Sequence, residues 1–128
     1  MKEQDLKFFS GVAALGGARS CRMMSFAPSA SAVLLSSLES VCPPLLLGCV
    51  RRLFPGLSLT VTEEERAALG VPENGDVEVF CRLAVPEADP LSAGFDLSRL
   101  VLVAPSSGRA LEVRRPDASV VALKKGGA

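Results

Sequence analysis

The sequence predicts a mainly β fold, a single-domain antiparallel sandwich or barrel with one or two short helices. Residues 76–84 (DVEVFCRLA) alternate with the period of two that is typical of a half-buried strand. Residues 100–115 indicate two strands joined by a turn that contains Gly108. Short apolar runs bounded by Pro, Ser or Gly recur along the rest of the chain, and this spacing favours a sandwich or a barrel.

The expected elements can be placed in order along the chain. A weak helical turn is expected over residues 11–18, where small residues dominate. The strand over residues 76–84 should send one face into the core, and in the hairpin Leu111 and Val113 should face inward. Further short strands are expected over residues 22–26, 32–37, 45–50, 57–61 and 119–123.

One helix is predicted from its ends. Thr62 and the acidic residues 63–65 form a capping box, because the Thr62 hydroxyl can accept from the backbone N–H of Glu65. The three carboxylates also suit the positive end of the helix dipole. Gly70 is placed to end the helix in a left-handed conformation, and Pro72 prevents it from resuming.

Composition limits the function. The chain has 128 residues, which fits one domain over residues 1–123 and a flexible tail over residues 124–128. The balance of 14 Lys and Arg against 14 Asp and Glu argues against direct nucleic-acid binding. The absence of His removes the usual general base and metal ligand. We therefore expect a binding or regulatory protein with no catalytic residue, cofactor or metal.

Cysteine usage and hydropathy predict a cytoplasmic protein. The four cysteines form no CxxC pair, so reduced, largely buried thiols are expected rather than a zinc site or a disulfide. The apolar stretch over residues 8–17 is short, and the charges before it cancel, unlike those of a signal peptide. The apolar stretch over residues 30–50 is interrupted by polar residues and by two prolines, so no membrane contact is expected.

Several short motifs follow one another from about residue 8 to residue 113, and their order resembles that of the bacterial flagellar assembly factor FliW family. The motifs are residues 8–11 (FFSG), 35–38 (LSSL), 53–57 (LFPGL), 62–70 (TEEERAALG), 79–86 (VFCRLAVP) and 96–105 (DLSRLVLVAP), followed by Arg109. The chain departs from the family pattern mainly at polar and aromatic positions: Ser36 replaces Gln, Gly56-Leu57 replaces Asp-Tyr, Asp96 replaces Asn, Arg99-Leu100 replaces Ala-Pro and Ala104 replaces Asn.

The resemblance implies a compact, cytoplasmic β-barrel-like protein that is not an enzyme. It implies two partners, flagellin and the translational regulator CsrA, whose repression of flagellin mRNA the protein relieves by partner exchange. Family members begin with a strand before the Phe-x-x-Gly motif, whereas only seven residues precede Phe8 here. We therefore expect this first strand to be missing or shortened, which would leave a sheet edge that something else must cover. We also expect the protein to be a monomer.

The resemblance also suggests where partners bind, because its signature residues concentrate in two segments. The candidate partner-binding residues are Leu35, Ser36, Ser37, Leu38, Asp96, Leu97, Arg99, Pro105 and Arg109. A second interpretation is a diverged β-barrel interaction module without flagellar partners, which the lost signature residues favour. A third, an enzyme that uses a thiol or a carboxylate, would need a Cys with an unusually low pKa.

Overall fold

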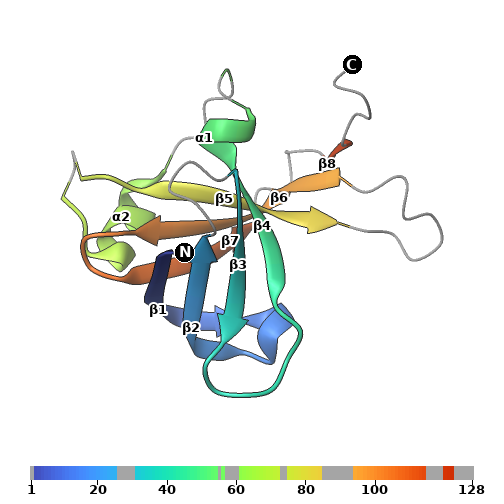
Figure 1. Ribbon diagram of the computed structural model, residues 1–128. Coiled ribbons are helices and arrows are strands. Elements are labelled where there is room, and N and C mark those ends of the chain that lie inside the picture. Colours follow the sequence, from blue (N-terminus) through green and yellow to red (C-terminus); the bar gives the residue numbers. More distant parts are fainter. Residues whose placement is uncertain are drawn as a thin grey trace.

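The computed structural model describes residues 2–25, 31–54, 56, 61–72, 75–84, 94–114 and 120–122. These residues form one sheet and three short helical segments (Figure 1). The strands are β1 (Lys2–Val12), β2 (Ala18–Ser25), β3 (Ala32–Ser37), β4 (Leu45–Cys49), β5 (Glu78–Ala84), β6 (Gly94–Ala104), β7 (Arg109–Arg114) and β8 (Val120–Ala122). The helical segments are η1 (Ala13–Leu15, a 3₁₀ turn), α1 (Val50–Leu53) and α2 (Glu63–Leu69).

The sheet closes on itself. The strand order is β5-β4-β3-β2-β1-β7-β6-β8, and β5 also pairs with β6, so seven strands form a ring and β8 is added beside β6. Neighbouring strands are antiparallel except β1 and β7, which run parallel at Lys7 and Phe8. The predicted mainly β, barrel-like fold is confirmed, and β1 has a strand partner on both sides, although its pairing with β7 is limited to Lys7 and Phe8.

Apolar side chains pack both inside and outside this barrel. The interior cluster includes Leu6, Phe8, Leu35, Leu47 and Val101, each less than 5% exposed. A second cluster lies between α1 and the ends of β5 and β6, and a third lies between α2 and the outer side of β6 and β7. Figure 1 shows α1 at one end of the barrel and α2 beside β7.

The faces of β5 and β7 that are buried differ from those predicted, because α1 and α2 cover the outside of the sheet. On β5, Phe80 packs in the interior and Cys81 packs under α1, so both faces are covered rather than one. On β7, Ala110 faces the interior, whereas Leu111 and Val113 pack outside the barrel against the cluster under α2. The prediction that Leu111 and Val113 face inward is therefore wrong, because the helices provide a second apolar layer.

The first strand was expected to be missing or shortened, and the first of these two alternatives is wrong. β1 is an 11-residue strand that pairs with β2 on one side and β7 on the other. Its register with β2 shifts between Lys7 and Val12, where Gly11 has a φ of 77°. A Cβ on Gly11 would lie 2.4 Å from the Gly17 carbonyl oxygen, so only glycine allows this bend.

Most local predictions are confirmed. β2, β3 and β4, the β6–β7 hairpin and β8 lie where short strands were expected, and η1 lies inside the expected helical turn. The capping box at the start of α2 is present in full, and Gly70 ends the helix with a φ of 69°. Helix α1 was not predicted, since Val50 was expected to end a strand. Residues 57–60, 119 and 123–128, on which other predictions fall, lie outside the described residues.

The thiols are free, and two of them are fully buried. Burial raises the pKa of Cys21 and of Cys81 to about 11 in each case, so neither thiol is activated. In the part of the chain that the structure describes, no helix is both long and apolar enough to span a bilayer.

Candidate partner-binding site

The first predicted segment lies at the end of β3. Leu35 is fully buried in the barrel interior, and Ser36 and Ser37 are half-buried. Leu38 is 46% exposed, and its backbone N–H donates to the Ser20 carbonyl oxygen at 2.9 Å. Leu38 therefore extends the β2–β3 pairing and presents an apolar side chain at the surface beside the start of β2.

Glu39 fixes this junction between β2 and β3. Its carboxylate accepts the backbone N–H groups of Ser20, at 2.6 Å, and of Arg19. These two hydrogen bonds lower the pKa of Glu39 below its ordinary value, and the positive charges of Arg19 and Lys7 add to the effect. Ser37 Oγ accepts the backbone N–H of Glu39 at 3.0 Å, so the turn holds the carboxylate in place.

The second predicted segment forms a bulge in β6. Arg82 of β5 is opposite Asp96, but Cys81 is opposite Leu100, so residues 97–99 have no partner on β5. Within the bulge, Leu97 is buried in the cluster under α1, whereas Arg99 is exposed, with its Nε 3.9 Å from Asp96 Oδ2.

Asp96 stabilises the bulge. Its Oδ1 accepts the backbone N–H of Ser98 at 2.9 Å and also the Ser98 hydroxyl. Partial burial raises the pKa of Asp96, but the Ser98 hydrogen bonds and the charges of Arg99 and Arg82 together hold it below its ordinary value. The side chain is thus an anionic structural group with limited exposure.

Pro105 and Arg109 flank the turn at the other end of β6. The Pro105 carbonyl oxygen accepts from Gln4 Nε2 at 3.1 Å, and Lys7 N–H donates to the Gly108 oxygen at 2.8 Å. Both contacts join the turn to β1. Both Pro105 and Arg109 are exposed, and Arg109 passes close to Gly70 at the end of α2.

The structure therefore separates the predicted residues into two places. Arg99 lies within β6 and Pro105 directly follows its last residue, so the two are six residues apart, which is about 20 Å at the usual rise per residue. Leu38, Pro105 and Arg109 lie near β1 and β2, whereas Asp96, Leu97 and Arg99 lie near β5 and α1. The sequence alone did not indicate this separation.

A groove of about 630 Å³ lies on the outer side of β1, and Arg109 is the predicted residue that lines it. The lining comes from β1, the start of β2, the exposed side of α2 and the start of β7: Lys7, Phe8, Phe9, Arg19, Ser20, Ala67, Ala68, Arg109 and Ala110.

Sequence reasoning did not identify Lys7, Phe9 or Arg19 as candidate site residues. Their signal was available, since Leu6 and Phe8 alternate with Lys7 and Phe9 along one strand.

The groove combines apolar surface with positive charge. Phe9 is 81% exposed, and the Ala67 and Ala68 side chains form a small apolar wall. Among the described residues, the side chains of Lys7, Arg19 and Arg109 take part in no ion pair or hydrogen bond. The described residues also hold no cluster of three or more potential metal ligands. This arrangement suits noncovalent recognition by apolar burial and charge.

Comparison with known proteins identifies a structural relative. A crystal structure titled as that of the flagellar assembly factor FliW superposes on this chain with a TM-score of 0.76, at 12% sequence identity. The match covers 95% of this chain and 88% of the other. The chain has the FliW fold. No family model matches the sequence, and no curated protein matches it either. The structural match thus confirms the predicted resemblance at the level of the fold.

Proposed function

We propose that this protein is a flagellar assembly factor that acts in the cytoplasm without catalysis. It binds flagellin and a CsrA-type translational regulator, and it relieves repression of flagellin translation by exchanging one partner for the other. The observation that carries the proposal is the similarity to the FliW crystal structure over 95% of the chain. The collinear motifs from residue 8 to residue 113 support it independently, because they follow the chain order of that family.

Partner exchange requires that the two binding equilibria be coupled. If flagellin lowers the affinity for the regulator by some factor, the regulator lowers the affinity for flagellin by the same factor. Free flagellin then displaces the regulator, which returns to its mRNA, and flagellin synthesis falls. No cofactor or covalent step is needed, so a rigid barrel with exposed binding surfaces suffices.

Both predicted segments stay in the proposal, with different roles for their members. Leu38, Arg99, Pro105 and Arg109 are exposed and can contact a partner. The half-buried side chains, Ser36, Ser37 and Asp96, shape the backbone that presents them, and Leu35 and Leu97 anchor that backbone from the core.

Isothermal titration tests the proposal directly. The purified protein is titrated with flagellin and with the CsrA homologue of the same organism, separately and in competition. Micromolar or tighter binding to both, with mutual displacement, is expected. Binding to flagellin alone would remove the regulatory arm of the proposal, and no binding by a folded protein would overturn it.

The contribution of the β6 bulge is tested by Arg99→Ala and Asp96→Ala. Arg99 is exposed, so its replacement should weaken partner binding with little effect on folding. Asp96→Ala removes the acceptor that holds the bulge, so its circular dichroism spectrum and unfolding midpoint must be compared with those of the wild type. Unchanged affinity in both variants would exclude this segment from the binding surface.

A diverged interaction module is the second candidate function. Its support is the loss of polar signature residues, such as the replacement of Gln by Ser36 and of Asn by Ala104, on a retained apolar frame. A genome that encodes flagellin and a CsrA homologue near this gene favours the flagellar assignment. A genome without flagellar genes favours the second.

A further inference from the structure

The groove beside β1 contains an exposed aromatic side chain, Phe9, whereas its neighbour in the sequence, Phe8, is buried. Phe8 is 2% exposed inside the barrel, whereas Phe9 is 81% exposed on the outer face of the same strand. An exposed Phe retains most of the unfavourable hydration that burial would remove. A ligand that covered Phe9 would therefore gain free energy that folding leaves unused.

Three basic side chains surround this apolar surface. Lys7 lies on β1, Arg19 lies on the neighbouring strand β2, and Arg109 lies at the start of β7 as the register partner of Lys7. The nearby carboxylate of Glu39 is engaged by two backbone N–H groups, and the groove lining contains no acidic side chain among the described residues. The local charge is thus positive, although the whole chain is neutral.

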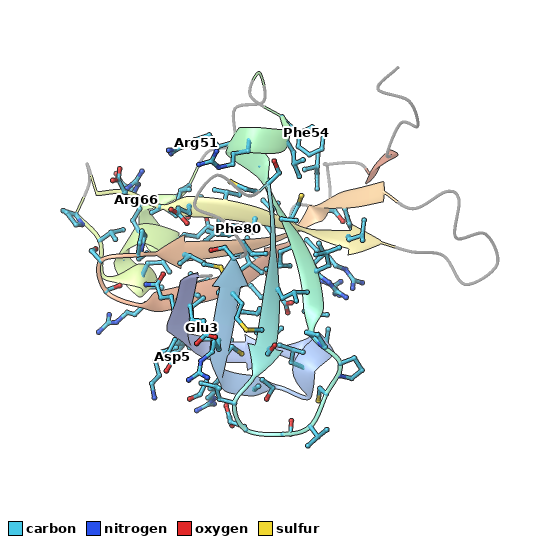
Figure 2. The ribbon with its side chains drawn as sticks, viewed as in Figure 1. Glu3, Asp5, Arg51, Phe54, Arg66 and Phe80 are labelled. Atoms are coloured by element: carbon cyan, nitrogen blue, oxygen red, sulfur yellow. The ribbon has the colours of Figure 1, made fainter. Side chains whose placement is uncertain are left out.

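The charge changes sign along the outer face of β1. Glu3 and Asp5 precede Lys7 and Phe9 on this face, and Figure 2 shows Glu3 and Asp5 projecting from the same side of the strand. Asp5 is paired with Arg22 at 2.8 Å, so the acidic half of the face already has an internal partner. The basic half, which forms the groove, makes no ion pair within 4 Å among the described residues, and its nearest carboxylate, Glu39, offsets only part of the charge of Lys7 and Arg19.

We propose that this groove binds an acidic peptide segment that places one apolar side chain against Phe9 and the Ala67–Ala68 wall. The segment's carboxylates meet Lys7, Arg19 and Arg109. A volume of about 630 Å³ is large enough for several side chains of one segment. A lone inorganic anion would leave Phe9 uncovered, which favours a peptide. The inference rests on the proposed function only in taking the partner to be a protein.

A synthetic peptide tests the groove without reference to any flagellar partner. The probe is a 15-residue helical peptide of Glu and Ala that carries Leu at i, i+4 and i+7, titrated into ¹⁵N-labelled protein. Shifts are expected at the amides of Lys7, Phe9, Arg19 and Arg109. A peptide with Lys in place of Glu should produce none, and one with Ser in place of Leu should bind at least about fivefold more weakly.

Substitutions in the protein that reverse a charge or shorten a side chain give the matched comparison. Lys7→Glu and Arg109→Glu should each weaken binding of the acidic peptide about tenfold, and Phe9→Ala about fivefold. The controls are Arg51→Glu on α1, far from β1 in Figure 2, and Leu46→Ala on β4. Equal loss in the controls, or shifts confined to other surfaces at millimolar peptide, would overturn the proposal.

The same variants separate this inference from the proposed function. If full-length flagellin and the CsrA homologue bind the wild type but bind Lys7→Glu and Arg109→Glu equally well, the groove is not their site and the function stands, and the inference is then decided by the acidic peptide. If neither full-length protein binds, the proposed function fails, and the acidic peptide alone decides the inference. Both the acidic peptide and any full-length partner that binds in the groove should lose affinity above about 0.3 M salt.

Discussion

The inner and outer faces of β1 have opposite roles. Inside, Leu6 and Phe8 are buried in a cluster to which each of the seven strands of the ring contributes. Outside, Lys7 and Phe9 line an open groove with one wall supplied by α2. Because side chains alternate along a strand, one segment can hold the fold together and present a binding surface. Mutations on the two faces should therefore separate stability from binding.

The largest effect is expected when Phe8 is compared with Phe9. Phe8→Ala should lower the free energy of unfolding by about 3–5 kcal/mol, because it leaves a cavity in the interior. Phe9→Ala should change it by no more than about 0.5 kcal/mol, because the side chain is exposed. Urea denaturation of both variants measures the difference. Similar losses in the two would contradict the assignment of the two faces.

The bend in β1 provides the next comparison. Gly11→Ala should destabilise the protein by about 2–3 kcal/mol, since its Cβ meets the Gly17 backbone and its φ is positive. Gly17 has almost the same φ, but a Cβ there would have nothing within 4 Å, so Gly17→Ala should cost only about 1 kcal/mol. Thermal unfolding followed by circular dichroism compares the two. Equal costs would show that conformation, and not the close approach, dominates.

Helix α2 forms one wall of the groove beside β1, and its start is fixed by the capping box. Thr62→Ala removes the hydroxyl that accepts the Glu65 N–H at 3.2 Å and should cost about 1 kcal/mol. In this variant, the backbone amides of residues 67–69, which include the groove wall, should lose the most protection from hydrogen exchange. Thr62→Ser keeps the hydroxyl and serves as the control. If Ser destabilises as much as Ala, the capping box is not the source of the effect.

The smallest effect is expected from pH. The pKa of Glu39 is lower in the folded protein than its ordinary value of 4.5, so its stabilising contribution is present above that value and is lost as the pH falls below it. Glu39→Gln should therefore reduce the loss of stability between pH 7 and pH 3, measured by urea midpoints. Glu39→Ala should lower the midpoint at pH 7 as well, because it removes the acceptor for Ser20 N–H. An unchanged pH dependence in Glu39→Gln would contradict this role.

Much of the fold could be predicted from the sequence because its signals are local. Three examples are the period of two over residues 76–84, the turn at Gly108 and the capping box at Thr62. Each of these signals is made by residues that lie close together in the chain. The structure reproduces all three. Helix α1 has no such signal, since Cys49 at its N-terminus provides no side-chain cap.

The candidate site was predictable only in part. Arg109 was identified through the family resemblance and lines the groove, whereas Lys7, Phe9 and Arg19 were not identified. These residues come from separate strands, and their proximity depends on the pairing of β1 with both β2 and β7. The Asp96–Arg99 segment lies elsewhere because the long strand β6 places Arg99 about 20 Å from Pro105 at the other end of the motif.

By itself the sequence determined most of the strands other than β1, the capped helix and a mainly β fold of the sandwich or barrel type, because side-chain period, capping and turn chemistry act between near neighbours in the chain. Only the tertiary structure decided that β1 closes the ring against β7, that β5 and β7 are covered on both faces, and that an aromatic residue and three bases meet in one groove. These features arise from contacts between residues as far apart as Lys7 and Arg109, which no local pattern encodes.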